Sequence, residues 1–222
     1  MRLAVLASGN GTNARAIVEA VRNGKLHAEV AVVLTNRPEA AVINRCRSLG
    51  VAVEVVPSRG IKDRAEYDSM VLKRLEPYRV DTVALAGWMR ILSDVFVNAF
   101  PDRIINLHPA VLPSFPGGTG INDAYEYAVK IAGCTVHFVS SDLDRGPVII
   151  QAAVPVSGSR DELEERIHEM EHLIFPQALQ WLAEGRIALD GRRVNILPPE
   201  GEVRRIDYIQ GCLISPPLEE RQ

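Results

Sequence analysis

The fold is decided by residues 3–13, which read 3-LAVLASGNGTN-13. The first five residues form a short, uninterrupted apolar run, which is typical of a parallel β-strand covered on both faces. Glycines follow at positions 9 and 11, and after them Ile17, Val18 and Val21 share one stripe of an amphipathic segment. This order predicts a strand, a glycine-rich turn and a helix, the unit from which doubly wound α/β sheets are built.

The same alternation continues through the first two thirds of the chain. Further apolar strands are predicted at residues 29–35, 51–56, 82–86 and 103–107, and amphipathic helices at residues 39–49 and 63–75. Asp63 and Glu66 have the spacing of a capping box, which indicates a helix start. Strand–helix–strand repetition of this kind predicts an α/β fold, a doubly wound and mostly parallel, Rossmann-like sheet with helices on both faces.

The last third has a different pattern. Residues 134–139 and 148–156 are expected to form two strands joined by the polar loop 140–147. Ser159 and Glu162 again have capping-box spacing, and they are expected to open a long helix that ends near residue 183.

A hairpin is predicted after this helix, because Asp190-Gly191 separates two short apolar and polar runs. Nothing marks a linker, so we predict one domain over residues 1–197. Prolines punctuate the remaining residues 198–222, for which we predict an irregular tail.

Composition excludes several classes of protein. The 222 residues are 47% hydrophobic and carry 25 Lys+Arg against 28 Asp+Glu, a net charge of −3, with no basic stripe for nucleic acid. The three cysteines stand singly, which argues against disulfides and CxxC metal sites. No apolar run is long enough for a membrane helix or a signal peptide. We therefore expect a cytoplasmic protein without a membrane or nucleic-acid partner.

Residues 8–13 lie where a helix N-terminus and glycines can bind an anion, so a phosphate site is predicted there. The rival interpretation is a tight turn alone. Gly9, Gly11 and Ala14 also fit a relaxed dinucleotide fingerprint, but no acid follows the second strand. Arg37 at that place keeps an NADP-binding reductase as an alternative.

Asn106 and His108 close the fifth predicted strand, and residues two apart in a strand project to the same side. An Asn and a His in this place are often structural, and residues 142–147, which contain Asp144, suggest an acidic surface loop when taken by themselves. If Asp144 faces His108, however, its carboxylate favours the protonated imidazole. This trio suits acyl transfer without a covalent intermediate, because it stabilises an oxyanion and supplies a proton.

Two further clusters each have two interpretations. Residues 87–92, Gly-Trp-Met-Arg-Ile-Leu, form either core or an apolar slot for a flat heterocycle. His168 and His172 are four residues apart on the long helix, which suits a metal, but no third ligand is evident. We expect a solvated helix face and no metal.

Taken together, the motifs resemble the glycinamide ribonucleotide formyltransferases, over nearly the whole chain up to the long helix. The resemblance is carried by residues 8–13, 86–92, 106–113 and 135–147 in this order and spacing. It implies transfer of the formyl group of 10-formyltetrahydrofolate, as cosubstrate, to the amine of 5-phosphoribosylglycinamide in purine biosynthesis. It also implies a monomer or homodimer.

The resemblance implies roles for individual residues. The catalytic residues would be Asn106, His108 and Asp144. The residues that bind the ribonucleotide would be Gly11, Thr12, Asn13 and Glu171. The residues that bind the folate would be Arg64, Met89, Arg90, Ile91, Leu92, Asn106, Val139, Ser140, Ser141, Asp142, Leu143 and Asp144. His137 also matches the family, and we interpret it as packing or hydrogen bonding within a strand.

Three alternatives remain open. Relatives with the same folate-binding core act on other acceptors or hydrolyse 10-formyltetrahydrofolate. An NADP-binding reductase is the second alternative, but it gives no role to Asn106, His108 and Asp144. A nucleotide sensor would bind the ribonucleotide without turnover. The loop at residues 118–120, Gly-Thr-Gly, departs from part of the family, and residues after 198 carry no family signal.

Overall fold

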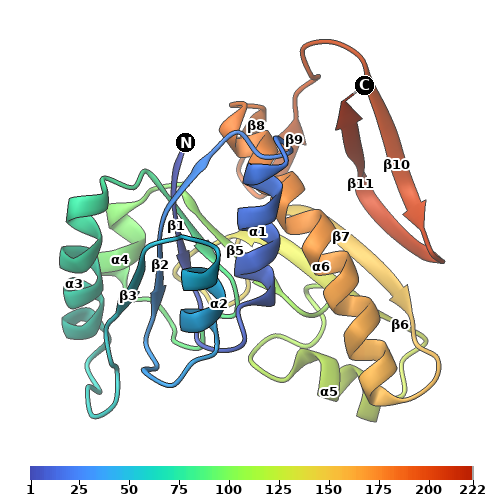
Figure 1. Ribbon diagram of the computed structural model, residues 1–222. Helices are drawn as coiled ribbons and strands as arrows, with labels where there is room; N and C mark the ends of the chain where they lie inside the picture. Colours follow the sequence, from blue (N-terminus) through green and yellow to red (C-terminus); the bar gives the residue numbers. More distant parts are fainter. Residues whose placement is uncertain (222) are drawn as a thin grey trace. The chain divides into compact units, whose positions relative to one another are not determined.

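The computed structural model describes residues 1–221, which divide into two compact units (Figure 1). The first unit comprises Met1–Asn106 and Val139–Asp142, and the second comprises Leu107–Phe138 and residues from 143 onward. The first unit takes residues 139–142 from within the stretch of chain that forms the second, so the two units are not simply consecutive segments. The predicted single domain over residues 1–197 stays a prediction.

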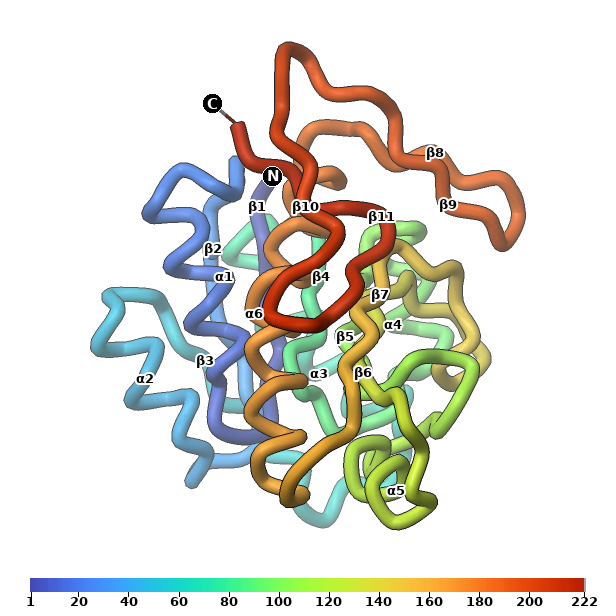
Figure 2. The backbone as a smooth tube through the Cα atoms, turned by 90° about the vertical axis from the view of Figure 1, so that its right-hand side faces the viewer, coloured from blue at the N-terminus to red at the C-terminus, as the bar shows by residue number. Residues whose placement is uncertain are grey.

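The first unit is built on a parallel sheet with the strand order β5-β4-β1-β2-β3. Its elements are β1 (Arg2–Leu6), α1 (Thr12–Arg22), β2 (Glu29–Thr35), α2 (Val42–Ser48), β3 (Val53–Val55), α3 (Arg64–Leu75), the 3₁₀ turn η1 (Glu76–Tyr78), β4 (Thr82–Leu85), α4 (Asp94–Ala99) and β5 (Ile104–His108). Helices α1 and α2 lie on one side of β1, β2 and β4, and α3 and α4 lie on the other (Figure 2). The predicted doubly wound α/β fold is confirmed.

Burial explains why these strands are apolar throughout. Leu3, Val5 and Leu6 of β1 are fully buried, because helices cover both faces of the strand. Beneath α3 and α4, Tyr67 and Phe96 are fully buried in the core. Side chains of this size contribute about 1.5–3 kcal/mol each when buried. Helix α4 was not predicted, since it has only six residues and too little periodicity to detect.

The second unit contains an antiparallel sheet with the strand order β10-β11-β7-β6 and a separate hairpin, β8-β9. Its elements are α5 (Gly120–Glu126), β6 (Ile131–Phe138), β7 (Val148–Pro155), α6 (Arg160–Ala183), β8 (Ile187–Asp190), β9 (Arg193–Ile196), β10 (Val203–Ile209) and β11 (Cys212–Arg221). The predicted hairpins β6-β7 and β8-β9 and the long helix α6 are all present. Ser159 closes the predicted capping box with Glu162. Among the described residues, no helix is long and apolar enough to cross a membrane.

The tail from residue 198 is not irregular, which corrects the sequence prediction. Residues 203–221 form the hairpin β10-β11, and β11 pairs with β7 through residues 213–215. Cys212, Ile214 and Leu218 are buried at 2%, 1% and 7% exposure. The prolines suggested an interruption, but the edge of β7 and the apolar face of α6 together favour a strand here.

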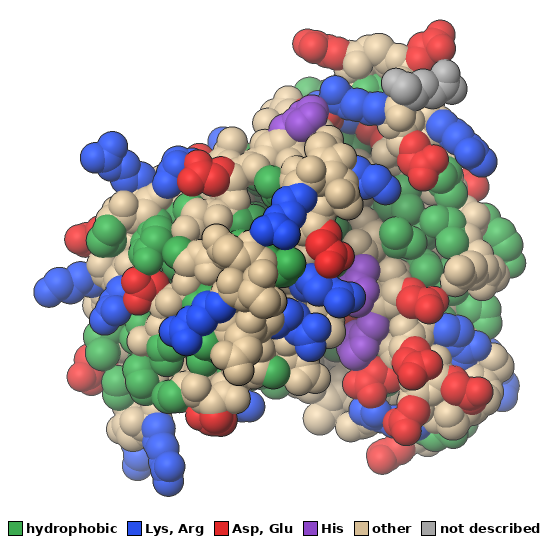
Figure 3. All heavy atoms as spheres, in the orientation of Figure 1, with side chains coloured by type: hydrophobic (Ala, Val, Ile, Leu, Met, Phe, Trp, Pro, Cys, Tyr) green, Lys and Arg blue, Asp and Glu red, His purple; other side chains and the backbone are tan. Residues whose placement is uncertain are grey.

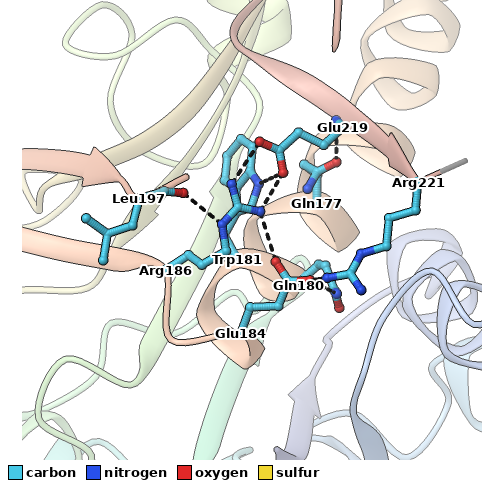
Figure 4. A network of polar contacts seen from close by, with 8 residues as sticks. All are labelled: Gln177, Gln180, Trp181, Glu184, Arg186, Leu197, Glu219 and Arg221. Carbon is cyan, nitrogen blue, oxygen red and sulfur yellow. Dashed lines mark hydrogen bonds and ion pairs between the residues drawn. The ribbon is translucent and has the colours of Figure 1, made fainter. Parts of the chain in front are cut away.

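A buried ion-pair network fastens β11 to the end of α6 (Figure 4). Arg186 donates to both carboxylate oxygens of Glu219 at 2.6 and 2.8 Å and to Glu184 at 2.9 Å. Its Nε donates to the carbonyl of Leu197 at 2.8 Å, and the indole of Trp181 donates to Glu219 at 3.0 Å. The Arg186 and Glu219 side chains are each 9% exposed. Glu219 and Glu184 therefore share one guanidinium, and Glu184 also pairs with Arg221.

Candidate active site

The glycine turn of the first unit follows β1 and leads into α1. Gly11 has φ 74°, in the left-handed region that favours glycine, and α1 then begins without a side-chain cap. The turn is fixed from outside, because Val42 N donates to the Gly9 carbonyl at 3.1 Å and Arg45 Nε to the Asn10 carbonyl at 2.8 Å. The N-terminus of α1 thus presents backbone N–H groups suited to an anion.

Gly11→Ala should destabilise the protein and weaken the binding of an anion at the N-terminus of α1. A Cβ at Gly11 would lie 2.4 Å from Val42 Cγ2, and the left-handed backbone alone costs about 1–2 kcal/mol for a residue other than glycine. Gly9→Ala is the matched control, since a Cβ there meets nothing within 4 Å. Urea unfolding measures the first effect, and the KM for the phosphorylated substrate that the family resemblance implies measures the second. If Gly11→Ala and Gly9→Ala had the same free energy of unfolding and the same KM, the conformation and close packing of Gly11 would not be required.

The segment after β4 divides its residues between the core and the surface. Trp88 is 8% exposed and packs in the core, whereas Met89 and Ile91 are 55% and 47% exposed. The hydroxyl of Ser8 accepts the N–H of Met89 at 2.9 Å, which holds the segment beside the glycine turn. Trp88 therefore belongs to the core, and the interpretation of Met89 and Ile91 as part of an apolar slot stays a prediction.

Arg90 and its surroundings are ordered by side chains that the sequence did not single out. The guanidinium of Arg90 lies 4.3 Å from the ring centroid of Tyr67, a cation–π contact, and donates to the Ile61 carbonyl at 3.4 Å. The Asp68 carboxylate accepts from the N–H and the hydroxyl of Ser93, at 2.6 Å each. Leu92 packs against the core, and the predicted residue Arg64 is exposed at the start of α3.

His108 and Asp144 meet in the second unit. His108 Nδ1 lies 3.6 Å from an Asp144 oxygen, and the two side chains are 4% and 7% exposed. His108 Nε2 lies 2.9 Å from the Phe115 carbonyl, and Asp144 also accepts the N–H of Gly117 at 2.8 Å. Asn106 precedes His108 by two residues in β5 and is half-buried. A carboxylate in this position stabilises a protonated imidazole.

Gly146 explains how the loop carrying Asp144 turns back toward β6. A Cβ at Gly146 would lie 1.7 Å from the Phe138 carbonyl oxygen, so no larger residue fits. In the same loop, Asp144 has φ 53°, in the left-handed region. This close approach is a tertiary constraint that places the carboxylate beside His108.

His137 is a third member of this cluster, and its role beside Asp144 was not predicted. Its Nε2 lies 3.8 Å from an Asp144 oxygen, and its Nδ1 donates to the Phe138 carbonyl at 2.8 Å. Burial lowers the pKa of His137 below 6.5, while the Phe138 hydrogen bond and the Asp144 carboxylate oppose this shift. This direction of the pKa shift favours a neutral His137 near pH 7.

This lowered pKa predicts a pH-dependent stability. The unfolded chain binds a proton at His137 below about pH 6.5 that the folded protein resists, so stability is lost as the pH falls from 7 to 5. His137→Asn should lose less free energy of unfolding over this interval than the wild type. Urea unfolding at both pH values measures the difference, with the exposed His27→Asn as control. Identical pH slopes for wild type and His137→Asn would refute the assignment.

The remaining folate-site residues of the sequence prediction lie in the loop after β6. Val139 N donates to the Ile104 carbonyl at 2.9 Å, and the Ser140 hydroxyl donates to the Asp142 carbonyl at 3.1 Å, all within the first unit. Ser141, Asp142 and Leu143 are exposed. The loop therefore presents both polar and apolar groups to solvent.

Helix α6 places Glu171 in the interior, which corrects the expected solvated face. Glu171 is 3% exposed, and His168 Nε2 lies 4.0 Å from its carboxylate. The Glu171 carboxylate lies near the Cys134 thiol of β6, whose pKa is raised by burial and, less strongly, by this charge. Among the described residues, no group of three His, Cys, Asp or Glu side chains is arranged to hold a metal.

Comparisons with known proteins show which family this chain is similar to. The family described as formyl transferase matches residues 1–179. Phosphoribosylglycinamide formyltransferase of Escherichia coli is 39% identical over 210 residues, which are 90% of this chain and 98% of that protein. The human trifunctional purine biosynthetic protein adenosine-3 is 40% identical over 85% of this chain, which spans only 19% of that protein. The structure of glycinamide ribonucleotide transformylase 1 from Symbiobacterium toebii has a TM-score of 0.86 and 44% identity, covering 89% of this chain and 94% of its own.

Proposed function

The chain belongs to the formyl transferase family, and we propose that it transfers a formyl group to the amine of 5-phosphoribosylglycinamide in purine biosynthesis. The observation that carries this proposal is the buried pair of His108 and Asp144, within a chain that aligns almost end to end with the E. coli enzyme. Such a pair supports acyl transfer, because it keeps a proton donor in place without a covalent nucleophile.

The formyl donor we propose is 10-formyltetrahydrofolate, as the family resemblance implies. This cosubstrate supplies the electrophilic formyl carbon. The exposed apolar side chains of Met89 and Ile91 fit a flat heterocycle, and the cation–π contact with Tyr67 holds Arg90 in place beside them. Arg64, Leu92 and residues 139–144 are the other proposed folate contacts.

The catalytic proposal assigns a task to each residue of the trio. The substrate amine attacks the formyl carbon and forms a C–N bond, which creates an oxyanion that hydrogen-bond donors stabilise. Collapse of this tetrahedral species breaks the bond between the formyl carbon and the folate nitrogen, which leaves with the proton that the amine gives up. The amide of Asn106 and a protonated His108 are the proposed donors. Asp144, held by Gly117 N, keeps the positive charge on His108 and orders a water that relays the proton. General acid catalysis of this kind contributes about 10²–10⁴-fold to a rate.

The ribonucleotide is proposed to bind through its two polar ends. The backbone of Gly11, with Thr12 and Asn13 at the start of α1, suits the phosphate, because the helix N-terminus favours a negative charge. Glu171 is the proposed partner of the glycinamide amine. Its burial makes the charge effective, since a buried carboxylate is little screened by water and salt.

Ultraviolet absorbance of a 10-formylfolate tests this function directly. Deformylation is expected only when phosphoribosylglycinamide is present in the cuvette. Deformylation without it would indicate a hydrolase, and none in either case would favour another acceptor, a nucleotide sensor or the NADP-binding reductase. That last alternative rests on Gly9 and Gly11 of the glycine turn, on Ala14 of α1 and on Arg37, which is exposed. The cytoplasmic location and the absence of a nucleic-acid partner stay predictions.

A further inference from the structure

The loop that carries Asp144 is held closely after this residue and is exposed before it. Phe138 N donates to the Pro147 carbonyl at 2.9 Å, and Gly146 passes so close to the Phe138 carbonyl that no Cβ fits between them. Residues 141–143, by contrast, are exposed. The position of the buried Asp144 carboxylate therefore depends on what fixes the main chain directly after it.

The peptide group between Arg145 and Gly146 is the link that an outside contact must fix. Gly146 has no Cβ, so its own side chain does not restrict its backbone. Asp144 has φ 53°, a left-handed conformation that persists in a residue other than glycine only where neighbouring contacts hold it. Rotation about the bonds beside this peptide group would displace Asp144 relative to His108, whose Nδ1 lies 3.6 Å from its carboxylate.

Arg192 supplies such a contact from the tip of the hairpin β8-β9. Its guanidinium donates to the Arg145 carbonyl at 2.8 Å, across 47 positions of the sequence. Arg192 follows Gly191, whose φ of 58° suits the tight turn between the two strands. Strand β9 contacts β7, which begins directly after the loop. Figure 2 shows the hairpin as an arm that follows α6.

The hairpin can hold the loop because its base is fixed in the interior. Leu197 N donates to the Arg186 carbonyl, and Arg186 Nε donates to the Leu197 carbonyl, at 2.8 Å each. Arg186 in turn belongs to the buried network with Glu219. Each residue of β8 pairs with a residue of β9 between this base and the tip. The contact of Arg192 is thus connected to the buried ion pairs of the same unit.

An exposed arginine is by itself no sign of such a role. Figure 3 shows basic side chains exposed beside acidic ones over the hairpin β10-β11, where Arg204 and Arg205 are exposed. Arg193 is exposed as well, and its partner across the β8-β9 hairpin is Asp190. Arg192 differs because it donates to a main-chain carbonyl next to a proposed catalytic residue.

We propose that Arg192 is a positioning residue for formyl transfer: by holding the Arg145 carbonyl, it keeps the Asp144 carboxylate beside His108. It acts through the main chain and not on a substrate. This inference rests on the proposed function, which gives Asp144 its catalytic task. It extends the support of the active site to the hairpin β8-β9, which lies after residue 179, where the match to the formyl transferase family ends.

Steady-state kinetics test the effect on the reaction. Arg192→Ala should lower kcat about three- to tenfold and leave the KM for both substrates within about twofold, because the lost hydrogen bond acts on Asp144 and not on a substrate. Arg192→Lys keeps a cationic donor and should recover most of the rate. Arg193→Ala is the matched control, since it removes the next arginine of the hairpin, and should leave kcat within about twofold.

Hydrogen exchange followed by NMR tests the position of the carboxylate without any substrate. The Gly117 N–H donates to Asp144 at 2.8 Å, so its exchange rate reports whether the carboxylate stays in place. In Arg192→Ala this amide should exchange about three- to tenfold faster, whereas Arg193→Ala should leave its rate unchanged. The Leu197 amide, bonded to Arg186 at the base of the hairpin, is the internal reference and should keep its rate in both variants.

The two measurements together decide the proposal. Faster exchange at Gly117 with a lower kcat in Arg192→Ala, both reversed in Arg192→Lys, supports it. Unchanged exchange at Gly117 overturns it, and so does faster exchange with an unchanged kcat. Equal acceleration at Leu197 also overturns it, because the hairpin would then have unfolded as a whole. A wild type without formyl transfer refutes the proposed function, while exchange at Gly117 still decides whether Arg192 holds Asp144.

Discussion

Replacing His108 by alanine is expected to lower kcat about 10³-fold, with a much smaller change in the KM for either substrate. The imidazole is buried, and its two nitrogens lie 3.6 Å from Asp144 and 2.9 Å from the Phe115 carbonyl. No other described histidine lies as close to Asp144. Alanine therefore removes the proposed proton donor and oxyanion partner together, while the rest of the cluster stays in place.

Steady-state kinetics with both substrates measure this effect, and His27→Ala is the control. His27 is exposed in the connection before β2, so its loss should leave kcat unchanged. His108→Asn keeps a hydrogen-bond donor but not a titratable proton, and should recover only part of the lost rate. Near-wild-type turnover of His108→Ala would overturn the proposed mechanism.

Arg186→Ala is expected to cost about 3–5 kcal/mol of the free energy of unfolding of the second unit. The change removes the guanidinium that pairs with Glu219 and Glu184, whose side chains are 9% and 11% exposed. Glu184 keeps its ion pair with Arg221, so the main loss falls on Glu219. An uncompensated buried carboxylate is much less favourable than the intact pair. The loss should also loosen β11. Glu219 of β11 accepts a hydrogen bond from the indole of Trp181, and Arg186 donates to the carbonyl of Leu197, so the same network holds all of these residues.

Urea unfolding followed by the fluorescence of Trp181 measures this loss. Trp181 donates to Glu219, and in a Trp88→Phe background it is the remaining tryptophan of the two in the sequence. Arg193→Ala removes an exposed arginine of the neighbouring hairpin and should change stability by less than about 0.5 kcal/mol. The double variant Arg186→Ala with Glu219→Ala should lose less than the sum of the single losses. A cost below about 1 kcal/mol for Arg186→Ala would show that the network is not structural.

Local patterns in the sequence correctly predicted most of the first unit. The span of β2 and the starts of α3 and α6 agree with the structure, because an apolar run or a capping residue is a property of neighbouring residues. The glycine turn after β1 was predicted for the same reason. Short elements such as α4 and α5 contain too few residues for a period to be recognised.

Only the tertiary structure decided which distant residues meet. The sequence offered Asp144 as a conditional partner of His108, and the approach depends on Gly146 passing close to the Phe138 carbonyl. Likewise, nothing in the spacing of α6 distinguished the buried Glu171 from its exposed neighbour Glu169.

The hairpin β10-β11 shows the same division between sequence and structure. Its prolines indicate an irregular tail when read locally, yet β7 supplies hydrogen bonds, and Arg186 supplies the charge that holds Glu219. Periodicity, caps and turns are recorded in neighbouring residues, so the sequence determined the elements. Buried charges and strand edges are stabilised by partners far along the chain, and for that reason only the folded protein decided the site and the tail.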